Sequence, residues 1–199
     1  MNSETGAAVS YLRGDLRVSV PAGSVSRVYV PDDRAKSRFI TAVLKAKCEA
    51  GEALELFGEA VHALSEPARA RVRRRIAVLS PIVGLIANLN VWENISLPAA
   101  YHGAPALERV AELAEQVLAR FGLQARLFLA RLPEELDVLE SKIAALVRLL
   151  AAEPALAIVD ALDAGLGRAE RERRPLFEAE LLARLPGATL LYVDSREED

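Results

Sequence analysis

The sequence predicts an α/β domain with a mainly parallel sheet core and an inserted helical lobe. Short apolar strands alternate with helices along most of the chain, which is the pattern of parallel sheets. Helices follow one another without strands between about residues 90 and 152, which predicts the lobe. The 199 residues, 52% of them apolar, suit one domain. We expect it to span residues 1–199, with a core at about 1–83 and 153–199 and a lobe at about 84–152.

The first half of the chain shows strand patterns separated by two helix patterns. Residues 16–20 alternate apolar and polar side chains, and residues 25–30 are rich in β-branched and aromatic side chains. A helix with one apolar face fits residues 36–47. Ser65 is the expected N-cap of a helix that carries the arginine run 69–75, a solvated face. The other strands are expected at residues 53–57 and 76–79.

The second half of the chain is mainly helical, with two further strands. Residues 84–98 are apolar but broken by three asparagines, which predicts a loop leading into a short helix. An apolar stripe over residues 107–121, ended by Gly122, predicts the clearest helix. Pro175 is expected to end or kink a helix over 169–185. The remaining expected elements are a helix at about 140–152 and strands at 155–159 and 188–193.

Charge and composition exclude several classes of protein. The net charge is −3, so no global basic field favours nucleic acid. The single cysteine, Cys48, rules out an internal disulfide framework and is expected to be a small buried side chain. The first residues lack the pattern of a secretory signal, and no apolar run approaches the ~20 residues that span a bilayer. We expect a cytoplasmic protein without a membrane span, free or peripheral on the inner face of the membrane.

Two groups of residues stand where nucleotide chemistry is expected. Lys36 and Ser37 follow a strand and a turn and open a helix, as in a phosphate-binding loop. Asp160 ends an apolar strand, in the place of the Walker B carboxylate. Further segments resemble, in family order, the Q-loop region, the signature lead-in, the D-loop and the strand before the H-loop of ATP-binding cassette (ABC) ATPases. These segments are residues 75–79 with 84–95, then 132–136, 164–166 and 189–193.

The resemblance covers about residues 16–196 and implies a P-loop NTPase-like ABC cassette. In that family Lys36, Ser37 and Asp160 would contact ATP and Mg²⁺. The stretch 88–95, Asn-Leu-Asn-Val-Trp-Glu-Asn-Ile, resembles the cassettes of lipid-transport (Mla-type) importers.

The phosphate loop departs from the family pattern. Residues 30–37 read Val-Pro-Asp-Asp-Arg-Ala-Lys-Ser and contain no glycine, so side chains crowd the backbone's approach to phosphate. Asp32 and Asp33 place negative charge where a polyanion would sit, and each such contact costs about 1 kcal/mol at ~4 Å in water. Lys36 and Ser37 are therefore either a weak nucleotide contact or an inherited helix start. The expected cofactor is at most weakly bound ATP with Mg²⁺.

The positions that hydrolyse ATP in the family hold other side chains here. Pro81 stands at the Q-loop glutamine, Ala161 at the catalytic glutamate and Ser195 at the H-loop histidine. Residues 137–140 read Asp-Val-Leu-Glu where the family has a Ser-Gly-Gly-Gln type of signature. These losses remove the groups that orient water and stabilise charge in phosphoryl transfer. We expect no catalytic residue and interpret the chain as a pseudo-ATPase.

The sequence predicts no metal site built by the protein alone. Asp160 and Asp163 suggest a carboxylate pair, but we interpret Asp160 as an inherited strand-end residue and Asp163 as a loop charge. The chain lacks the Cys and His spacings of metal sites.

The expected function is that of a non-catalytic ABC cassette subunit that docks on a membrane permease or pairs with an active ATPase, as a homo- or heterodimer. In ABC ATPases the segment after the Q-loop lines the groove that receives the permease. Two alternatives stay open: a slow ATPase subunit that a partner completes, and a soluble regulator of an ABC ATPase. The contact candidates, which could instead only pack the lobe, are Leu85, Ile86, Leu89, Val91 and Trp92.

Overall fold

The computed structural model describes residues 6–102 and 106–196, and these group into two compact units. Unit 1 takes in Met1–Val78, Pro154–Asp160 and Gly187–Asp199. Unit 2 takes in Leu79–Glu153 and Ala161–Pro186. The expected single domain stays a prediction.

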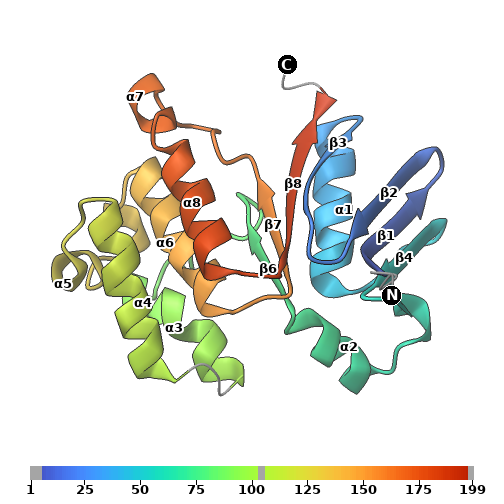
Figure 1. The fold of residues 1–199 in the computed structure, drawn as a ribbon, viewed down its shortest axis with the longest axis horizontal. Coiled ribbons are helices and arrows are strands. Elements are labelled where there is room, and N and C mark those ends of the chain that lie inside the picture. The colour runs from blue at the N-terminus through green and yellow to red at the C-terminus, as the bar shows by residue number, and fades with distance from the viewer. Residues whose placement is uncertain (1–5, 103–105, 197–199) are drawn as a thin grey trace. The chain divides into compact units, whose positions relative to one another are not determined.

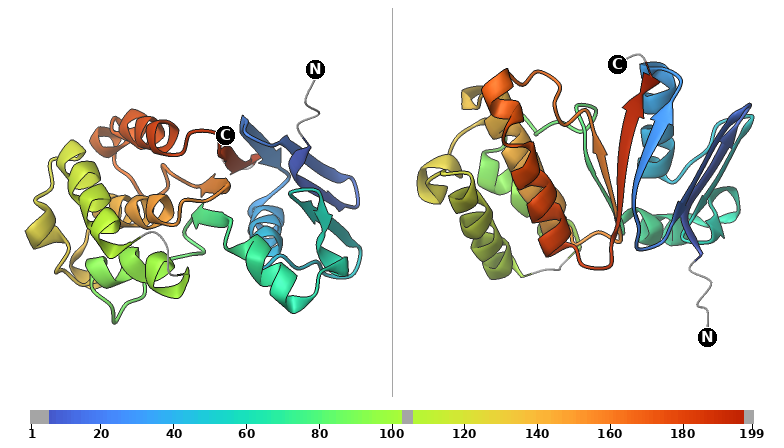
Figure 2. Two further views of the ribbon diagram at one scale, coloured as in Figure 1. Left: turned by 60° about the horizontal axis from the view of Figure 1, so that its bottom comes forward. Right: turned by 45° about the horizontal axis from the view of Figure 1, so that its top comes forward.

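Unit 1 contains two four-stranded sheets with a helix, α1, between them (Figures 1 and 2). The parallel sheet has the strand order β3-β8-β7-β6, and the antiparallel sheet has the order β2-β1-β4-β5. The elements are β1 (Ala7–Arg13), β2 (Leu16–Pro21), β3 (Val25–Val30), α1 (Asp33–Lys45), β4 (Glu52–Leu56), β5 (Glu59–Ala60), the 3₁₀ turn η1 (Val61–Ala63), α2 (Glu66–Arg73), β6 (Ile76–Leu79), β7 (Leu156–Asp160) and β8 (Thr189–Ser195).

The parallel sheet confirms the predicted fold class. Its strands β3 and β6 have the predicted bounds, and β7 and β8 lie within one or two residues of theirs. Strand β8 lies between β3 and β7 and runs parallel to both. Its neighbour β3 is far from it in sequence. Strand β1 and the antiparallel sheet that it joins were not predicted.

Helix α1 packs by its apolar face against both sheets. Phe39, Ile40 and Val43 are fully buried, and such side chains each stabilise a fold by about 1.5–3 kcal/mol. The ring of Phe39 meets that of Tyr11 on β1 edge to face, with centroids 5.1 Å apart. The predicted N-cap of α2 is confirmed, because the Ser65 hydroxyl accepts from the backbone N–H of Ala68.

Unit 2 is helical. Most of the predicted stripe of α4 is confirmed, since Val110, Ala114 and Val117 are fully buried, but Leu107 at its start is 48% exposed. The expected helix over 169–185 is two helices, and Pro175 lies in the first turn of the second one. The elements are α3 (Val91–His102), α4 (Leu107–Arg120), α5 (Ala125–Phe128), the 3₁₀ turn η2 (Pro133–Glu135), α6 (Val138–Ala151), α7 (Arg168–Arg171) and α8 (Arg174–Arg184).

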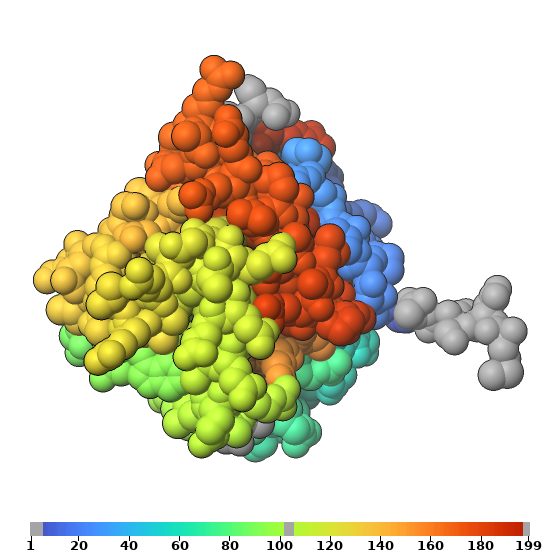
Figure 3. Space-filling model, turned by 60° about the vertical axis from the view of Figure 1, so that its left-hand side comes forward, coloured from blue at the N-terminus to red at the C-terminus, as the bar shows by residue number. Residues whose placement is uncertain are grey.

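Helices α4 and α8 lie side by side on one face of unit 2 (Figure 3). Arg184 on α8 donates to the Gln116 side chain on α4 at 3.0 Å. Arg120 on α4 lies 3.3 Å from Glu180, whose side chain is 6% exposed. Over residues 6–102 and 106–196, no helix combines the length and the hydropathy that crossing a bilayer requires.

Candidate functional site

The chain turns from β3 into α1 within two residues, Pro31 and Asp32. Asp32 is the N-cap of α1, and its side chain accepts from the backbone N–H of Ala35 at 2.6 Å. The helix therefore begins at Asp33, three residues before Lys36, where the sequence predicted its start. A helix N-terminus is a ready anion site, because its amides point outward and carry partial positive charge. Here a carboxylate of the chain itself already accepts from one of those amides.

Lys36 lies inside the first turn of α1 and is buried, with 5% of the residue exposed. Its ammonium nitrogen lies 3.1 Å from Oδ1 of Asp33 and 3.3 Å from Oδ1 of Asp160. Asp160 is buried at the end of β7. The lysine that the sequence assigned to phosphate is thus flanked by two carboxylates of its own unit.

Ser195 extends this arrangement to the end of β8. Its hydroxyl donates to Oδ1 of Asp33 at 2.7 Å, and the residue is buried. This hydrogen bond and the ammonium of Lys36 hold the pKa of Asp33 below its usual value. We call Asp33, Lys36, Asp160 and Ser195 the Lys36 network. Through it the first turn of α1 is tied to the ends of both β7 and β8.

Ser37 does not join the Lys36 network. One residue advances a helix by about 100°, so neighbouring side chains point in different directions. Lys36 is buried, whereas Ser37 is exposed and lines a groove on the outer face of α1. Of the three predicted nucleotide contacts, the structure brings Lys36 and Asp160 together and places Ser37 on another face.

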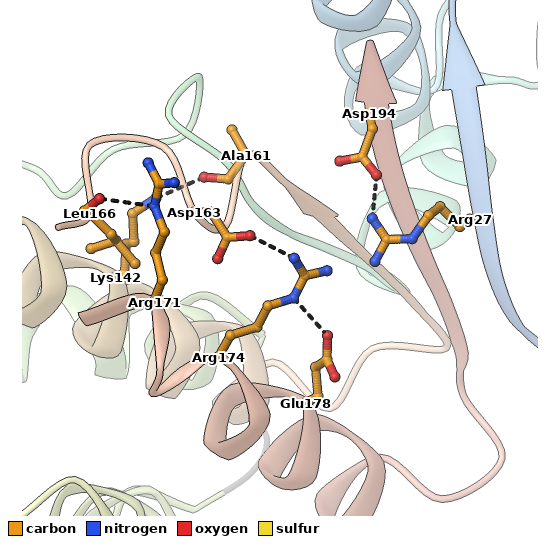
Figure 4. A network of polar contacts seen from close by, with 9 residues as sticks. All are labelled: Arg27, Lys142, Ala161, Asp163, Leu166, Arg171, Arg174, Glu178 and Asp194. Atoms are coloured by element: carbon orange, nitrogen blue, oxygen red, sulfur yellow. Dashed lines mark hydrogen bonds and ion pairs between the residues drawn. The ribbon is translucent and has the colours of Figure 1, made fainter. Parts of the chain in front are cut away.

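The segments that carry Ala161 and the D-loop lie in unit 2. Ala161 has a left-handed backbone, with φ 51°, and its carbonyl accepts from the Lys142 ammonium at 2.8 Å. Asp163 pairs with Arg174 at 2.6 Å, and Arg174 also contacts Glu178 at 3.0 Å (Figure 4). The side chain of Asp163 is therefore held by a cation of α8. In the described residues, no group of three or more His, Cys, Asp or Glu is arranged to hold a metal ion.

Figure 4 also shows an ion pair within unit 1, between Arg27 on β3 and Asp194 on β8. The guanidinium of Arg27 lies over the ring of Tyr192, 5.0 Å from its centroid. These contacts fasten β3 to β8 next to Ser195.

The start of α6 carries residues 137–140, where the resemblance predicts the signature. Asp137 is its N-cap and accepts from the backbone N–H of Glu140 at 2.7 Å. Glu140 in turn accepts from the backbone N–H of Asp137 at 3.0 Å, which completes a capping box. A carboxylate thus accepts from an amide of this helix N-terminus too. Val138 is 46% exposed, and a Cβ on Gly165 would come within 3.3 Å of its Cγ1.

The loop before α3, residues 81–90, is held from inside unit 2 by two polar side chains, of which Asn94 is buried and Arg148 is half-buried. Asn94 accepts from the N–H of Ile86 at 2.7 Å and donates to the carbonyls of Ile86, Leu89 and Asn90. Arg148 donates to the carbonyls of Val83 and Gly84 at 2.7 and 2.9 Å. Burial lowers the pKa of Arg148 below its usual value. The loop conformation is thus fixed by side chains of α3 and α6.

The docking candidates differ in exposure. Ile86 is 44% exposed, while Leu85, Leu89 and Trp92 are half-buried. Val91 is fully buried and packs the interior of unit 2, which removes it from any docking surface.

Cys48, expected to be buried, is only half-buried.

Sequence reasoning missed three features in and around the loop 81–90. Ile82 is 45% exposed close to a pocket of about 350 Å³ whose lining, largely apolar, includes Pro81, Val83 and Leu85. Asn94 and Arg148 were not singled out either. A lone arginine among Leu146–Leu150 and an asparagine beside buried apolar residues were the available signals, since buried polar groups need partners.

Comparison of the sequence with known proteins finds relatives among ATP-binding proteins of importers. No family model matches the chain. The methionine import ATP-binding protein MetN of Brucella abortus is 28% identical over 143 residues, which are 72% of this chain and 38% of that protein, and MetN of Brucella suis matches equally. The chain therefore spans well under half the length of these curated relatives.

Solved structures agree on the fold. The structure of cbiO1 from Clostridium perfringens, part of the ABC transporter complex cbiONQ, matches with a TM-score of 0.71 and 15% identity over 96% of this chain and 79% of its own. A dimeric ATP-binding cassette bound to ADP and Pi matches with a TM-score of 0.72 and 20% identity over 96% and 85%. The chain has the fold of an ABC cassette, which confirms the predicted fold class. The narrower likeness to lipid-transport cassettes stays a prediction.

Proposed function

We propose that this chain is a non-catalytic cassette subunit that docks on a membrane permease at its cytoplasmic face. The observation that carries the proposal is the Lys36 network. The chain's own carboxylates surround the ammonium that would bind the outer phosphates of ATP. Asp32 in addition caps the helix end that would face those phosphates.

The cost of opening the Lys36 network argues for weak nucleotide binding. Breaking a buried ion pair while its partner stays buried costs about 3–5 kcal/mol. Since about 1.4 kcal/mol is a tenfold change in affinity, the cost equals roughly two to three powers of ten. To offset this cost, the Mg²⁺ that accompanies ATP would have to bind Asp160 in place of the Lys36 ammonium. ATP is thus at most a weak ligand in this proposal.

The absence of hydrolysis rests on separate positions. Pro81, Ala161 and Ser195 lack the side chains that would contact Mg²⁺, polarise the attacking water and stabilise the γ-phosphate. Ser195 instead donates a hydrogen bond to Asp33. Asp137 places a carboxylate at the α6 N-terminus, where the partner subunit's phosphate would approach.

The docking part of the proposal rests on the loop 81–90. Its backbone is fixed by Asn94 and Arg148, while Ile82 and Ile86 remain exposed beside the apolar pocket. A preorganised loop loses little conformational entropy on binding. A short amphipathic helix from a permease fits such a surface by inserting an apolar side chain into the pocket. MetN, to which this chain is similar, is by its name the ATP-binding protein of an importer.

Nucleotide binding is tested by calorimetry of the purified chain with Mg-ATP up to about 1 mM, the weak end of ordinary substrate constants. We expect no phosphate release and no saturable binding that depends on Lys36. The Asp33→Asn variant, which removes one competing charge, should bind ATP more tightly than the wild type. Glu59→Gln, an exposed change on β5, is the matched control. Tight Mg²⁺-dependent binding that Lys36→Ala abolishes would establish the slow-ATPase alternative instead.

Docking is tested by cross-linking in native membranes, with identification of the captured chains by mass spectrometry. Ile82→Asp with Ile86→Asp should abolish capture of a membrane-spanning subunit. Leu127→Asp with Leu182→Asp, at side chains 65% and 54% exposed elsewhere in unit 2, should leave it unchanged. Capture of an ATPase subunit without any membrane protein would favour the soluble-regulator alternative.

A further inference from the structure

The outer face of α1 in unit 1 carries a groove of about 410 Å³ that the proposed function does not use. It begins in the first turn of α1 and continues past its C-terminus. The lining residues are Arg34, Ser37, Arg38, Thr41, Ala42, Lys45, Lys47, Glu49 and Glu52.

The spacing of the lining residues follows one helix face. Arg34, Ser37, Thr41 and Lys45 are three or four residues apart, so their side chains form one row. At 1.5 Å per residue the row extends about 16 Å. Lys36, one position away from Ser37, is buried on another side of the helix. The groove is therefore separate from the Lys36 network.

The acidic residues of the groove are engaged within unit 1. Glu52 has 1% of its side chain exposed and accepts from the Tyr11 hydroxyl at 2.9 Å and from the backbone N–H of Glu49 at 2.8 Å. It also lies 3.4 Å from the guanidinium of Arg13. Glu49 pairs with Arg38 at 3.3 Å. Neither carboxylate is left to neutralise the remaining cations.

Among the residues that the structure describes, three cations of the groove find no such partner. Within residues 6–102 and 106–196, the side chains of Arg34, Lys45 and Lys47 form neither a hydrogen bond nor an ion pair. Each is exposed, and they share one concave surface with the hydroxyls of Ser37 and Thr41. Like charges gathered without counterions repel one another, so an anion that binds here is stabilised by several cations at once.

The end of α1 holds Lys47 at the groove although Lys47 lies outside the helix. Ala46 adopts a left-handed conformation with φ 46°, and its N–H donates to the carbonyl of Val43. The N–H of Lys47 donates to the carbonyl of Ala42 at 3.0 Å, which completes a Schellman motif. The backbone of Lys47 is thus fixed against the last turn, close to Lys45.

We propose that this α1 groove binds a phosphate-bearing polyanion. A guanidinium offers paired donors to phosphate oxygens, the ammonium groups act as point charges, and the two hydroxyls add neutral donors. Consecutive phosphates carry charge more densely than the alternate carboxylates along one face of an extended acidic peptide, and so match a short row of cations better. The source is a soluble polyphosphate or a phosphorylated headgroup, because both present the same group.

The first test is calorimetry of the whole chain with inorganic tripolyphosphate in low salt without Mg²⁺. Arg34→Gln, Lys45→Gln and Lys47→Gln combined should weaken binding about tenfold or more. Arg71→Gln, Arg74→Gln and Arg126→Gln combined change the net charge equally at exposed sites outside the groove and should change binding less than about twofold. Ser37→Ala should weaken it about threefold. Raising the salt should weaken binding to the wild type, because counterions screen exposed charges.

Vesicles distinguish the two sources. The first measurement is flotation with phosphatidylcholine vesicles that contain a phosphorylated inositol lipid. If the wild type floats with these vesicles and the groove variant does not, the ligand is a lipid headgroup, even where free tripolyphosphate binds weakly. Calorimetry identifies a soluble polyphosphate. The proposal is overturned if the chain binds neither tripolyphosphate nor the vesicles. It is also overturned if the control variant loses as much binding as the groove variant, or if the chain prefers a glutamate hexapeptide.

The same measurements separate this inference from the proposed function. Ser195→Ala and Lys36→Met alter the Lys36 network but not the groove, so both should retain tripolyphosphate binding. Loss of binding in Lys36→Met alone, with the groove variant unaffected, would place the anion in the network and contradict both proposals. Absence of any anion binding overturns only the groove.

Discussion

The ammonium nitrogen of Lys36 lies 3.3 Å from Oδ1 of Asp160, and the two side chains are 6% and 3% exposed. A lysine and a carboxylate buried at this distance form a unit, because either charge alone would be costly in the interior. The pair also joins α1 to β7, and through Asp33 and Ser195 the contact reaches β8.

Lys36→Met should destabilise the protein by roughly 3–5 kcal/mol, because the substitution leaves Asp160 buried without its main counter-charge. The free energy of unfolding from urea titration measures the loss. In the double variant Lys36→Met with Asp160→Leu most of the loss should be recovered, since two apolar groups replace both charges. A loss below about 1 kcal/mol, the value typical of exposed pairs, would mean that the ammonium is solvated and available to a ligand.

At acid pH, Asp33 should lose its contribution to the stability of the fold. Its pKa in the folded protein lies below the ordinary value of 3.8, first because Ser195 donates to it and then because of Lys36. A lowered folded pKa means that the ionised group stabilises the fold above the unfolded pKa, and that this is lost as the pH falls through the folded pKa.

The measurement is urea unfolding of the wild type and of Asp33→Asn across this range. The stability difference should be constant from about pH 5 to 7 and should close below about pH 4. Ser195→Ala should reduce the difference at neutral pH. A difference that grows on acidification would contradict the assigned hydrogen bond.

Asn94→Ala should loosen the loop 81–90. The substitution deletes hydrogen bonds to the N–H and carbonyl of Ile86 and leaves partly buried backbone groups unpaired, at a cost of roughly 2–3 kcal/mol. Hydrogen exchange of the Ile86 amide should accelerate before that of α4 does. Asn88→Ala, at an exposed position of the same loop, should change stability by less than about 0.5 kcal/mol.

Gly165→Ala should destabilise unit 2 by roughly 1–2 kcal/mol, since Gly165 has φ 75°, where an L-residue is strained. A further cost comes from Val138, whose Cγ1 would lie 3.3 Å from the new Cβ. Thermal unfolding of the single variants and of Gly165→Ala with Val138→Ala separates the two effects. The double variant should regain only the steric part; full additivity would mean that Val138 moves aside freely.

Ala161→Glu should not produce ATP hydrolysis. The variant places a carboxylate where the resemblance predicts the catalytic glutamate, but Pro81 and Ser195 still lack the partner groups and Lys36 remains paired. Phosphate release with Mg-ATP should stay at background. Turnover in this single variant would show that nucleotide already binds productively and would favour the slow-ATPase interpretation.

Much of the parallel sheet could be predicted because its strands are short, apolar and bounded by turn residues. Strand β1 was missed because a register shift between Ala7 and Val9 interrupts its pairing with β2, so that Ala8 and Val9 are both buried. A bulge of this kind hides the alternation on which strand prediction depends.

The candidate site was predicted in its members but not in its contacts. The resemblance placed the start of the helix at Lys36, although Asp32 carries an N-cap signal three residues before Ala35. Sequence spacing alone could not show that Asp33 meets Ser195, because 162 residues separate them. The role of Arg148 depended likewise on which carbonyls the loop presents to α6.

The pairing of β3 with β8 has a consequence for how the chain is made. Arg27 and Asp194, which join these strands, are 167 residues apart in sequence. At roughly 5–20 residues per second, a ribosome needs on the order of ten seconds to deliver β8 after β3. During that time β3, with the exposed apolar side chains Val25 and Tyr29, has no partner from β8 and can pair with other chains. Growth temperature and chaperone supply should therefore govern the soluble yield more than the stability of the finished fold does.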